Sequence, residues 1–156
     1  MLDRHGPALL LFARQWSISM ADAEDALQNG FLKFWKTRRR ARNELAWLYA
    51  CVRSAAMDLG RSDRRRIARQ SQAAAGEETM FDSSSADRAE REALIESALR
   101  QLPGDQREVV VMKIWGNLTF AQIAGAVNIS PNTAASRYRY AMAKLAKDLS
   151  EEMTYE

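Results

Sequence analysis

The sequence predicts an all-α protein. Of its 156 residues only 7 are glycine and 3 are proline, and 47% are hydrophobic, as in a folded chain rather than a disordered one. Apolar residues recur at intervals of three and four residues over most of the length. Alternating Val, Ile and Thr bounded by Asn-Gly turns, the pattern of β-hairpins, is largely missing. We therefore expect two small helical domains joined by a flexible linker.

The first half of the chain has the apolar pattern of three helices. One is expected over residues 7–17, a second over 22–35 and a third from about Glu44 to Leu59, with Gly60 as a C-terminal stop. The basic segment 37–43 has no apolar period and is expected to be a loop. The basic run after Gly60 either extends the third helix or frays. Within the second helix, Ala23, Ala26, Leu27, Gly30, Phe31, Phe34 and Trp35 have the spacing of one inward face.

A Ser-, Ala- and acid-rich segment separates the two halves. Residues 71–87 contain only two large apolar residues, which is typical of a linker. We expect a first domain over 1–68, a linker over 69–87 and a second domain over 88–150. The acids of this segment are Glu77, Glu78, Asp82 and Asp87, and its composition is that of a solvated tether.

The net charge of +3 is modest, but the charges are strongly segregated. Residues 36–69 hold eleven Lys or Arg against three acids, and 132–147 hold four cations and no acid. Residues 77–96 reverse the balance, with seven acids against two arginines. Two basic blocks flanking an acidic one suggest two surfaces that bind polyanions.

The second half predicts four short helices, over 88–101, 107–115 and 120–127 and from Pro131 onward. Four residues are expected to cap helix starts. Ser19 and Thr119 precede apolar runs, Asp105 precedes the helix over 107–115, and Ser130 precedes a proline at the first helical position.

The last two of these helices have the pattern of a helix-turn-helix. The first is short, apolar and rich in small residues, and the second is basic. In the second, Ala134, Tyr138, Ala141 and Leu145 are expected to face the core. The remaining side chains face solvent or a ligand and can reach phosphates and base edges: Asn132, Thr133, Ala135, Ser136, Arg137, Arg139 and Tyr140. A helical hairpin with a solvated polar face is the alternative.

Catalysis is not expected. The chain has one cysteine, Cys51, and one histidine, His5, and it lacks a Ser/His/Asp set, a metal-ligand cluster and a phosphate-cradling glycine loop. We expect no metal and no cofactor. No stretch is long enough to insert in a membrane and no signal-peptide plan is present, so we expect a cytoplasmic protein.

Two sets of motifs resemble one family. LPGDQREVVVMKIWGNLTFAQIAGAVNISPNTAASRYRYAMAKL, residues 102–145, resembles region 4 of bacterial RNA polymerase sigma factors of the extracytoplasmic-function (ECF) group. ADAEDALQNGFLKFWK, residues 21–36, and AWLYACVRSAAMDLGRSDRRR, residues 46–66, resemble region 2 of the same family. The region 4 positions that fit are Leu102, Pro103, Gln106, Arg107, Leu118, Thr119, Ile123, Ala124, Pro131, Thr133, Ser136, Arg137 and Ala141.

The resemblance implies a sigma factor that binds core RNA polymerase at its clamp and flap regions and directs promoter recognition, DNA melting and transcription initiation. The helix-turn-helix residues named above would read the minus-thirty-five element. Minus-ten contacts are implied for Arg38, Arg39, Arg40, Arg42, Asn43, Ser54, Arg61, Arg64 and Arg65. Polymerase contacts are implied for Asp22, Asp25, Gln28, Asn29 and Leu32. An anti-sigma factor is a further candidate partner.

Four positions depart from the family pattern. Asn132 stands at a common Gly, Ala135 at a usual Lys or Arg, Ser54 at a frequent Asn and Asn29 at a usual Glu. The promoter sequence therefore does not follow from the resemblance. Two other functions fit the helical pattern alone: a stand-alone helix-turn-helix regulator, and a helical adaptor with no DNA role.

Overall fold

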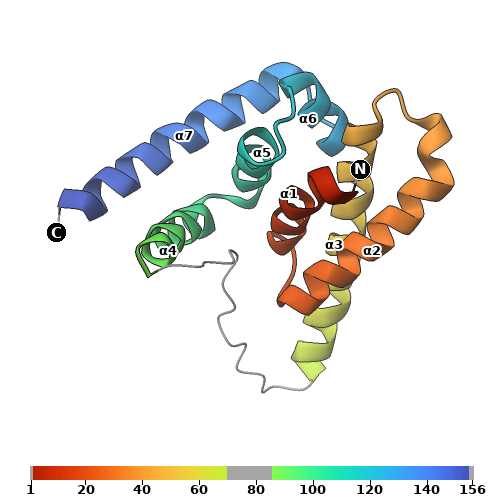
Figure 1. The fold of residues 1–156 in the computed structure, drawn as a ribbon, viewed down its shortest axis with the longest axis horizontal. Helices are drawn as coiled ribbons and strands as arrows, with labels where there is room; N and C mark the ends of the chain where they lie inside the picture. Colours follow the sequence, from red (N-terminus) through yellow and green to blue (C-terminus); the bar gives the residue numbers. More distant parts are fainter. Residues whose placement is uncertain (1, 70–85, 155–156) are drawn as a thin grey trace.

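The computed structural model describes residues 2–69 and 86–154, and within these ranges it contains α-helices, one 3-10 helix and no strand (Figure 1). The expected all-α class is confirmed. Most of the expected linker lies outside the described residues, including Glu77, Glu78 and Asp82. The helices are α1 (Leu2–Arg14), α2 (Met20–Thr37), η1 (Arg38–Arg40), α3 (Glu44–Arg69), α4 (Ala86–Gln101), α5 (Gly104–Ile114), α6 (Phe120–Val127) and α7 (Pro131–Thr154).

The close approach of α2 and α3 depends on a glycine. A Cβ placed on Gly30 would lie 2.7 Å from the Cα and 2.9 Å from the backbone nitrogen of Val52. No real Cβ comes this close to a backbone atom, so only glycine fits here without moving a helix. The two helices bury Ala23, Ala26 and Phe34 on one side and Leu48 and Val52 on the other.

One apolar cluster joins both halves of the chain. Phe12 on α1 and Tyr49 on α3 pack edge to face at 5.1 Å, and the same cluster contains Met112 on α5 and Ile123 on α6. A smaller cluster holds α4, α5 and α7 together through Leu99, Leu102, Val110, Ala141 and Leu145. The division into domains at residues 68 and 88 stays a prediction, but the described helices of the two halves pack against each other.

Local signals at helix starts are confirmed in three places. The Ser19 hydroxyl accepts a hydrogen bond from the Asp22 backbone N–H at 3.1 Å. Thr119 forms a full capping box with Gln122, and the Ser130 hydroxyl accepts from the Thr133 N–H at 3.1 Å. Each of these bonds satisfies a backbone donor that the helix itself leaves unpaired.

Gly60 does not end α3, which continues to Arg69. The expectation that the helix stops there was wrong. Gly60 instead allows a close contact between α3 and the chain at Trp16, because a Cβ added to Gly60 would lie 3.0 Å from the Trp16 carbonyl oxygen. The basic run after Gly60 was expected either to extend the third helix or to fray, and it extends α3.

Two other local expectations were wrong. Segment 37–43 is not all loop, since Thr37 ends α2 and the next three residues form η1. Asp105 does not cap α5, because the helix begins at Gly104 behind Pro103. The Asp105 carboxylate instead accepts from the Gln106 N–H at 2.9 Å.

Cys51 is expected to be unreactive in the folded protein. It is buried, and burial raises the pKa of its thiol against smaller opposing effects of Thr37 and Lys33. Because the thiolate is the reactive form, we expect an aromatic disulfide reagent at neutral pH to modify the native chain at least about a hundredfold more slowly than the urea-unfolded chain. Equal rates in the two states would show that the α3 core opens freely.

Candidate nucleic-acid and polymerase interfaces

The turn between α6 and α7 is built from three residues. Asn128 ends α6 in the left-handed conformation, with φ at 58°, a conformation that Asn tolerates better than most side chains. Ile129 donates its N–H to the Ala124 carbonyl at 3.1 Å, and Ser130 caps α7. The left-handed helix end at Asn128 was not predicted, although an Asn directly after an apolar helix is a known signal of a helix C-terminus.

The register of α7 agrees with the expected inward face. Ala134 and Ala141 are fully buried, Leu145 is nearly so, and Tyr138 packs edge to face on Phe120 at 5.6 Å. The opposite side of the first turns is polar. Among the side chains expected to meet DNA, Asn132 and Arg139 are exposed, and Thr133, Ala135, Ser136 and Arg137 are partly exposed.

The two arginines of α7 differ in their surroundings. Arg137 is half-buried, and its Nε lies 3.6 Å from a carboxylate oxygen of Asp105 on α5. Arg139 points elsewhere and donates to the Ser136 hydroxyl at 3.2 Å. The structure therefore holds Arg137 against the body of the helix-turn-helix and leaves Arg139 at the rim.

The residues assigned to the minus-ten element are spread along α3 rather than gathered at one point. Arg39, Arg40, Arg42 and Asn43 lie at or just before its start and are exposed, whereas Ser54 lies about 16 Å further along the helix and Arg65 about 33 Å along it. Arg61 and Arg65 are exposed, and the side chain of Arg64 is outside the description.

Several members of this set also have structural partners. The Asn43 side-chain oxygen accepts from the Ala46 N–H at 2.9 Å and so caps α3. The Arg38 guanidinium lies 3.9 Å from the Trp35 ring centre, and the Ser54 hydroxyl accepts from Lys33 at 2.9 Å. Trp47 donates from its indole N–H to the Thr37 hydroxyl at 2.8 Å.

The basic loop before α3 opens onto a groove of about 370 Å³. One wall comes from this loop and α3, with Arg40, Arg42 and Asn43 among its residues, and the other comes from Gln122 and Gly125 of α6. Three of the minus-ten candidates, Arg40, Arg42 and Asn43, thus share a groove with α6, the first helix of the helix-turn-helix, an arrangement that the sequence did not indicate.

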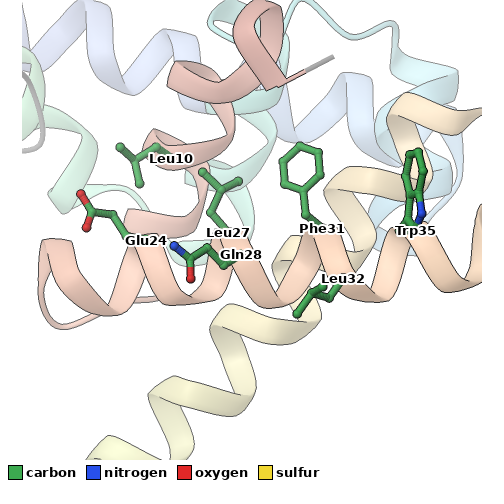
Figure 2. Close-up of a pocket in the computed structure, with 7 residues that line it drawn as sticks. All are labelled: Leu10, Glu24, Leu27, Gln28, Phe31, Leu32 and Trp35. Carbon is green, nitrogen blue, oxygen red and sulfur yellow. The ribbon is translucent and has the colours of Figure 1, made fainter.

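The residues assigned to polymerase form one stripe on α2. Gln28 and Asn29 lie three and four positions after Asp25, and Leu32 follows them by four and three positions. All four are exposed, and Asp22 begins the same stripe half-buried. Beside them lies an open groove of about 710 Å³. Figure 2 shows Leu10 of α1 above this groove and Leu27, Phe31 and Trp35 rising from α2 toward it.

This face is more apolar than the sequence indicated. Trp35 was expected to face inward, but its exposed fraction is 65%, and that of Leu32 is 62%. A helix turns 100° per residue, so once Phe34 is buried the next position points away from the core. Large exposed apolar side chains next to an apolar groove are typical of a protein-binding surface.

Two features are absent from residues 2–69 and 86–154. No group of three or more His, Cys, Asp or Glu there is placed to hold a metal ion. No helix of these ranges combines the length and the apolar character needed to cross a bilayer.

Comparison with known proteins gives two family matches in chain order. Residues 1–66 match Sigma-70 region 2, and residues 92–145 match Sigma-70, region 4. The ECF RNA polymerase sigma factor SigL of Mycobacterium tuberculosis is 31% identical over 160 aligned positions, and the match covers 97% of this chain and 88% of SigL.

Two solved structures are similar over nearly the whole chain. The sigma factor RpoE from Bartonella quintana, in complex with the anti-sigma factor NepR, is 23% identical with a TM-score of 0.77 over 96% of this chain and 94% of RpoE. CnrH in complex with the cytosolic domain of CnrY is 25% identical with a TM-score of 0.68 over 96% of this chain and 85% of CnrH.

A stand-alone regulator or a helical adaptor would not account for both family matches. The chain belongs to the ECF sigma factors, regulatory proteins that direct RNA polymerase in promoter recognition and transcription initiation.

Proposed function

We propose that three described surfaces divide the work of promoter-directed initiation. The first turns of α7 bind the minus-thirty-five element, the loop before α3 and the basic face of α3 bind the minus-ten element, and the stripe on α2 binds core polymerase. The chain would do this in the cytoplasm, as two domains over 1–68 and 88–150 that separate on the promoter.

The register of α7 carries the minus-thirty-five assignment. Ala134, Tyr138 and Ala141 anchor the helix to α5 and α6, so its opposite side is free to enter a major groove. Asn132, Thr133 and Ser136 are hydrogen-bonding side chains, and Ala135 can offer only its methyl group, for example to a thymine methyl. We assign base readout to Arg137 and contact with the phosphate backbone to Arg139.

The exposed arginines support the minus-ten assignment. Arg39, Arg40 and Arg42 concentrate positive charge at the loop, and Arg61 and Arg65 continue it along α3. A melted strand needs neutralised phosphates along its path, and a row of guanidinium groups provides them. Asn43 and Ser54 lie beside this row and can bond to base edges.

The apolar character of the α2 stripe supports the polymerase assignment. Leu32 and Trp35 remain exposed in the chain alone, so covering them with a partner removes apolar surface from water. The neighbouring acids Asp22 and Asp25 add charge that favours a basic partner face. A similar protein, RpoE, is solved with the anti-sigma factor NepR, and we extend this to propose an anti-sigma factor as a competing partner of the present chain.

Replacing Leu32 with serine tests the polymerase surface. Because Leu32 is exposed, the change should leave helicity and melting temperature nearly unchanged. Losing an apolar anchor of an interface should raise the Kd for core polymerase at least about tenfold, measured by fluorescence anisotropy. Run-off transcription at a cognate promoter should fall in parallel at limiting sigma concentration.

Ile114→Ser is the matched control. Ile114 is also an exposed apolar residue, at 45%, but it lies on α5 away from the α2 stripe. We expect its polymerase affinity to stay within about twofold of the unchanged chain. If Leu32→Ser binds core polymerase as tightly as Ile114→Ser does, the α2 stripe is not the docking surface.

A further inference from the structure

Three arginines from separate helices line one small pocket. Arg14 is the last residue of α1, Arg100 lies in the last turn of α4, and Arg107 lies near the start of α5. The segment between α1 and α2 provides the rest of the described lining, with Gln15, Ser17 and Ile18. None of these described lining residues is acidic. The pocket therefore gathers positive charge from parts of the chain that are distant in sequence.

The guanidinium of Arg107 is held in place by neutral groups. Its Nη2 donates to the carbonyl oxygen of Leu102 at 3.0 Å and to that of Arg100 at 3.4 Å. Its Nε is buried and has no hydrogen-bond partner among the described residues. No carboxylate within 2–69 and 86–154 forms an ion pair with it. The cation is thus fixed in direction without an opposite charge from the described chain.

Burial and a neighbouring cation both disfavour the charge on Arg107. Burial lowers the pKa of its guanidinium, and the positive charge of Arg100 lowers this pKa further. Arg107 nevertheless stays protonated at neutral pH, because the ordinary pKa of a guanidinium is far above 7. Glu96 pairs with Arg100 at 2.6 Å, whereas Arg14 adds a third, buried cation to the same pocket. An anion placed among these groups would stabilise all three.

The size of the pocket and the guanidinium chemistry together select a terminal phosphate group. The pocket has a volume of about 230 Å³. This is below the roughly 300–1,000 Å³ of pockets that hold drug-sized ligands. Guanidinium groups match the geometry of phosphate oxygens. A terminal phosphate offers three such oxygens, one for each arginine, whereas a phosphodiester of a nucleic-acid backbone offers two.

Ser17 adds a hydrogen-bond acceptor to the pocket. Its hydroxyl donates to the Ala13 carbonyl at 2.8 Å, so toward a ligand its oxygen can only accept. Inorganic phosphate and pyrophosphate both keep a P–O–H group at neutral pH and can donate to this oxygen. Sulfate is fully deprotonated and cannot. The pocket therefore favours a phosphate over another dianion of the same shape.

We propose that the pocket between the end of α1, the end of α4 and the start of α5 binds a terminal phosphate group, carried by inorganic phosphate, pyrophosphate or a phosphate monoester. This site is separate from the surfaces assigned to polymerase and promoter DNA, and it does not rest on those assignments. A ligand that binds the folded chain stabilises it, so the site makes stability dependent on phosphate concentration.

Calorimetric titration of the full chain in a phosphate-free buffer of constant ionic strength tests the site. Pyrophosphate should bind at one site per chain with a Kd at or below about 1 mM. Inorganic phosphate should also show saturable binding. Sulfate should bind at least about threefold more weakly than inorganic phosphate, because it lacks one hydrogen bond. Dimethyl phosphate, which represents a backbone phosphodiester, should bind more weakly than either phosphate probe.

Variants of the lining arginines test the assignment of residues. Arg100→Gln and Arg107→Gln should each raise the Kd for pyrophosphate at least about tenfold, because each removes a charge-assisted contact. Arg88→Gln is the matched control. Arg88 also lies on α4 and pairs with a glutamate four positions away, Glu92 at 3.1 Å, but it does not belong to the pocket. Its Kd should stay within about twofold of the unchanged chain.

Four results would overturn the proposal. Neither phosphate probe binds saturably, or Arg88→Gln weakens binding as much as Arg100→Gln does. Equal binding of dimethyl phosphate would instead indicate a contact for a nucleic-acid backbone, and equal binding of sulfate a site for any dianion. Circular dichroism shows whether each variant is folded. If Arg107→Gln fails to fold, Arg100→Gln decides, because the Arg100 side chain is 43% exposed.

Discussion

Replacing Gly30 with alanine is expected to lower the free energy of unfolding by at least about 2 kcal/mol. The added Cβ would meet the Val52 backbone at 2.7–2.9 Å, so α2 and α3 would have to move apart along their whole contact. Overpacking of this kind typically costs about 1–3 kcal/mol, and rigid backbone on the opposing side favours the upper end. Alanine's better helix propensity, worth about 1 kcal/mol, offsets only part of the cost.

Gly6→Ala is the control, because it should change stability in the opposite direction. Gly6 also lies within a helix, α1, but a Cβ there would find nothing within 4 Å. Only the propensity gain applies, so stability should rise by about 0.5–1 kcal/mol. Urea unfolding followed by circular dichroism measures both variants. If Gly30→Ala is as stable as Gly6→Ala, the tight approach of α2 to α3 is not a feature of the protein in solution.

Arg137→Ala is expected to weaken binding at the preferred promoter by about 1–3 kcal/mol and to relax base choice at one position. The Asp105 carboxylate lies 3.6 Å from the Arg137 Nε and restrains one side of the guanidinium. The loss of this partly exposed ion pair should cost the fold itself less than about 1 kcal/mol. Binding of the holoenzyme to a panel of base-substituted promoters at several salt concentrations measures both effects.

Arg139→Ala is the companion variant. Arg139 lies two residues beyond Arg137, about 200° around the helix, and is exposed at the rim. As a phosphate contact it should weaken all promoter sequences about equally and reduce the salt dependence of binding. If Arg137→Ala instead lowers affinity equally for every sequence, Arg137 positions the helix and does not read a base.

The sequence determined those features of the protein that depend on near neighbours in the chain. Ser19, Thr119 and Ser130 each bond to an N–H three residues away, so their capping roles could be predicted without tertiary contacts. The inward register of α7 followed in the same way from the spacing of Ala134, Tyr138 and Ala141. The family could also be identified, because its motifs are contiguous segments.

Tertiary structure decided what depends on residues distant in the chain. Gly60 has the local character of a helix stop, and only the Trp16 carbonyl packed against it explains why α3 continues. Trp35 fits an apolar period, and its exposure depends on where α1 and α3 leave α2 uncovered.

The relation between the candidate surfaces was equally hidden from the sequence. The stripe on α2 and the polar face of α7 could be assigned from helical spacing and motifs, because each lies on a single helix. The pairing of Glu108 with Arg53, 55 residues away, and the groove shared by the minus-ten loop and α6 could not. A charged side chain on a helix must be either paired with an opposite charge or hydrated. Only the packing of separate helices determines which of these applies and which residue becomes the partner.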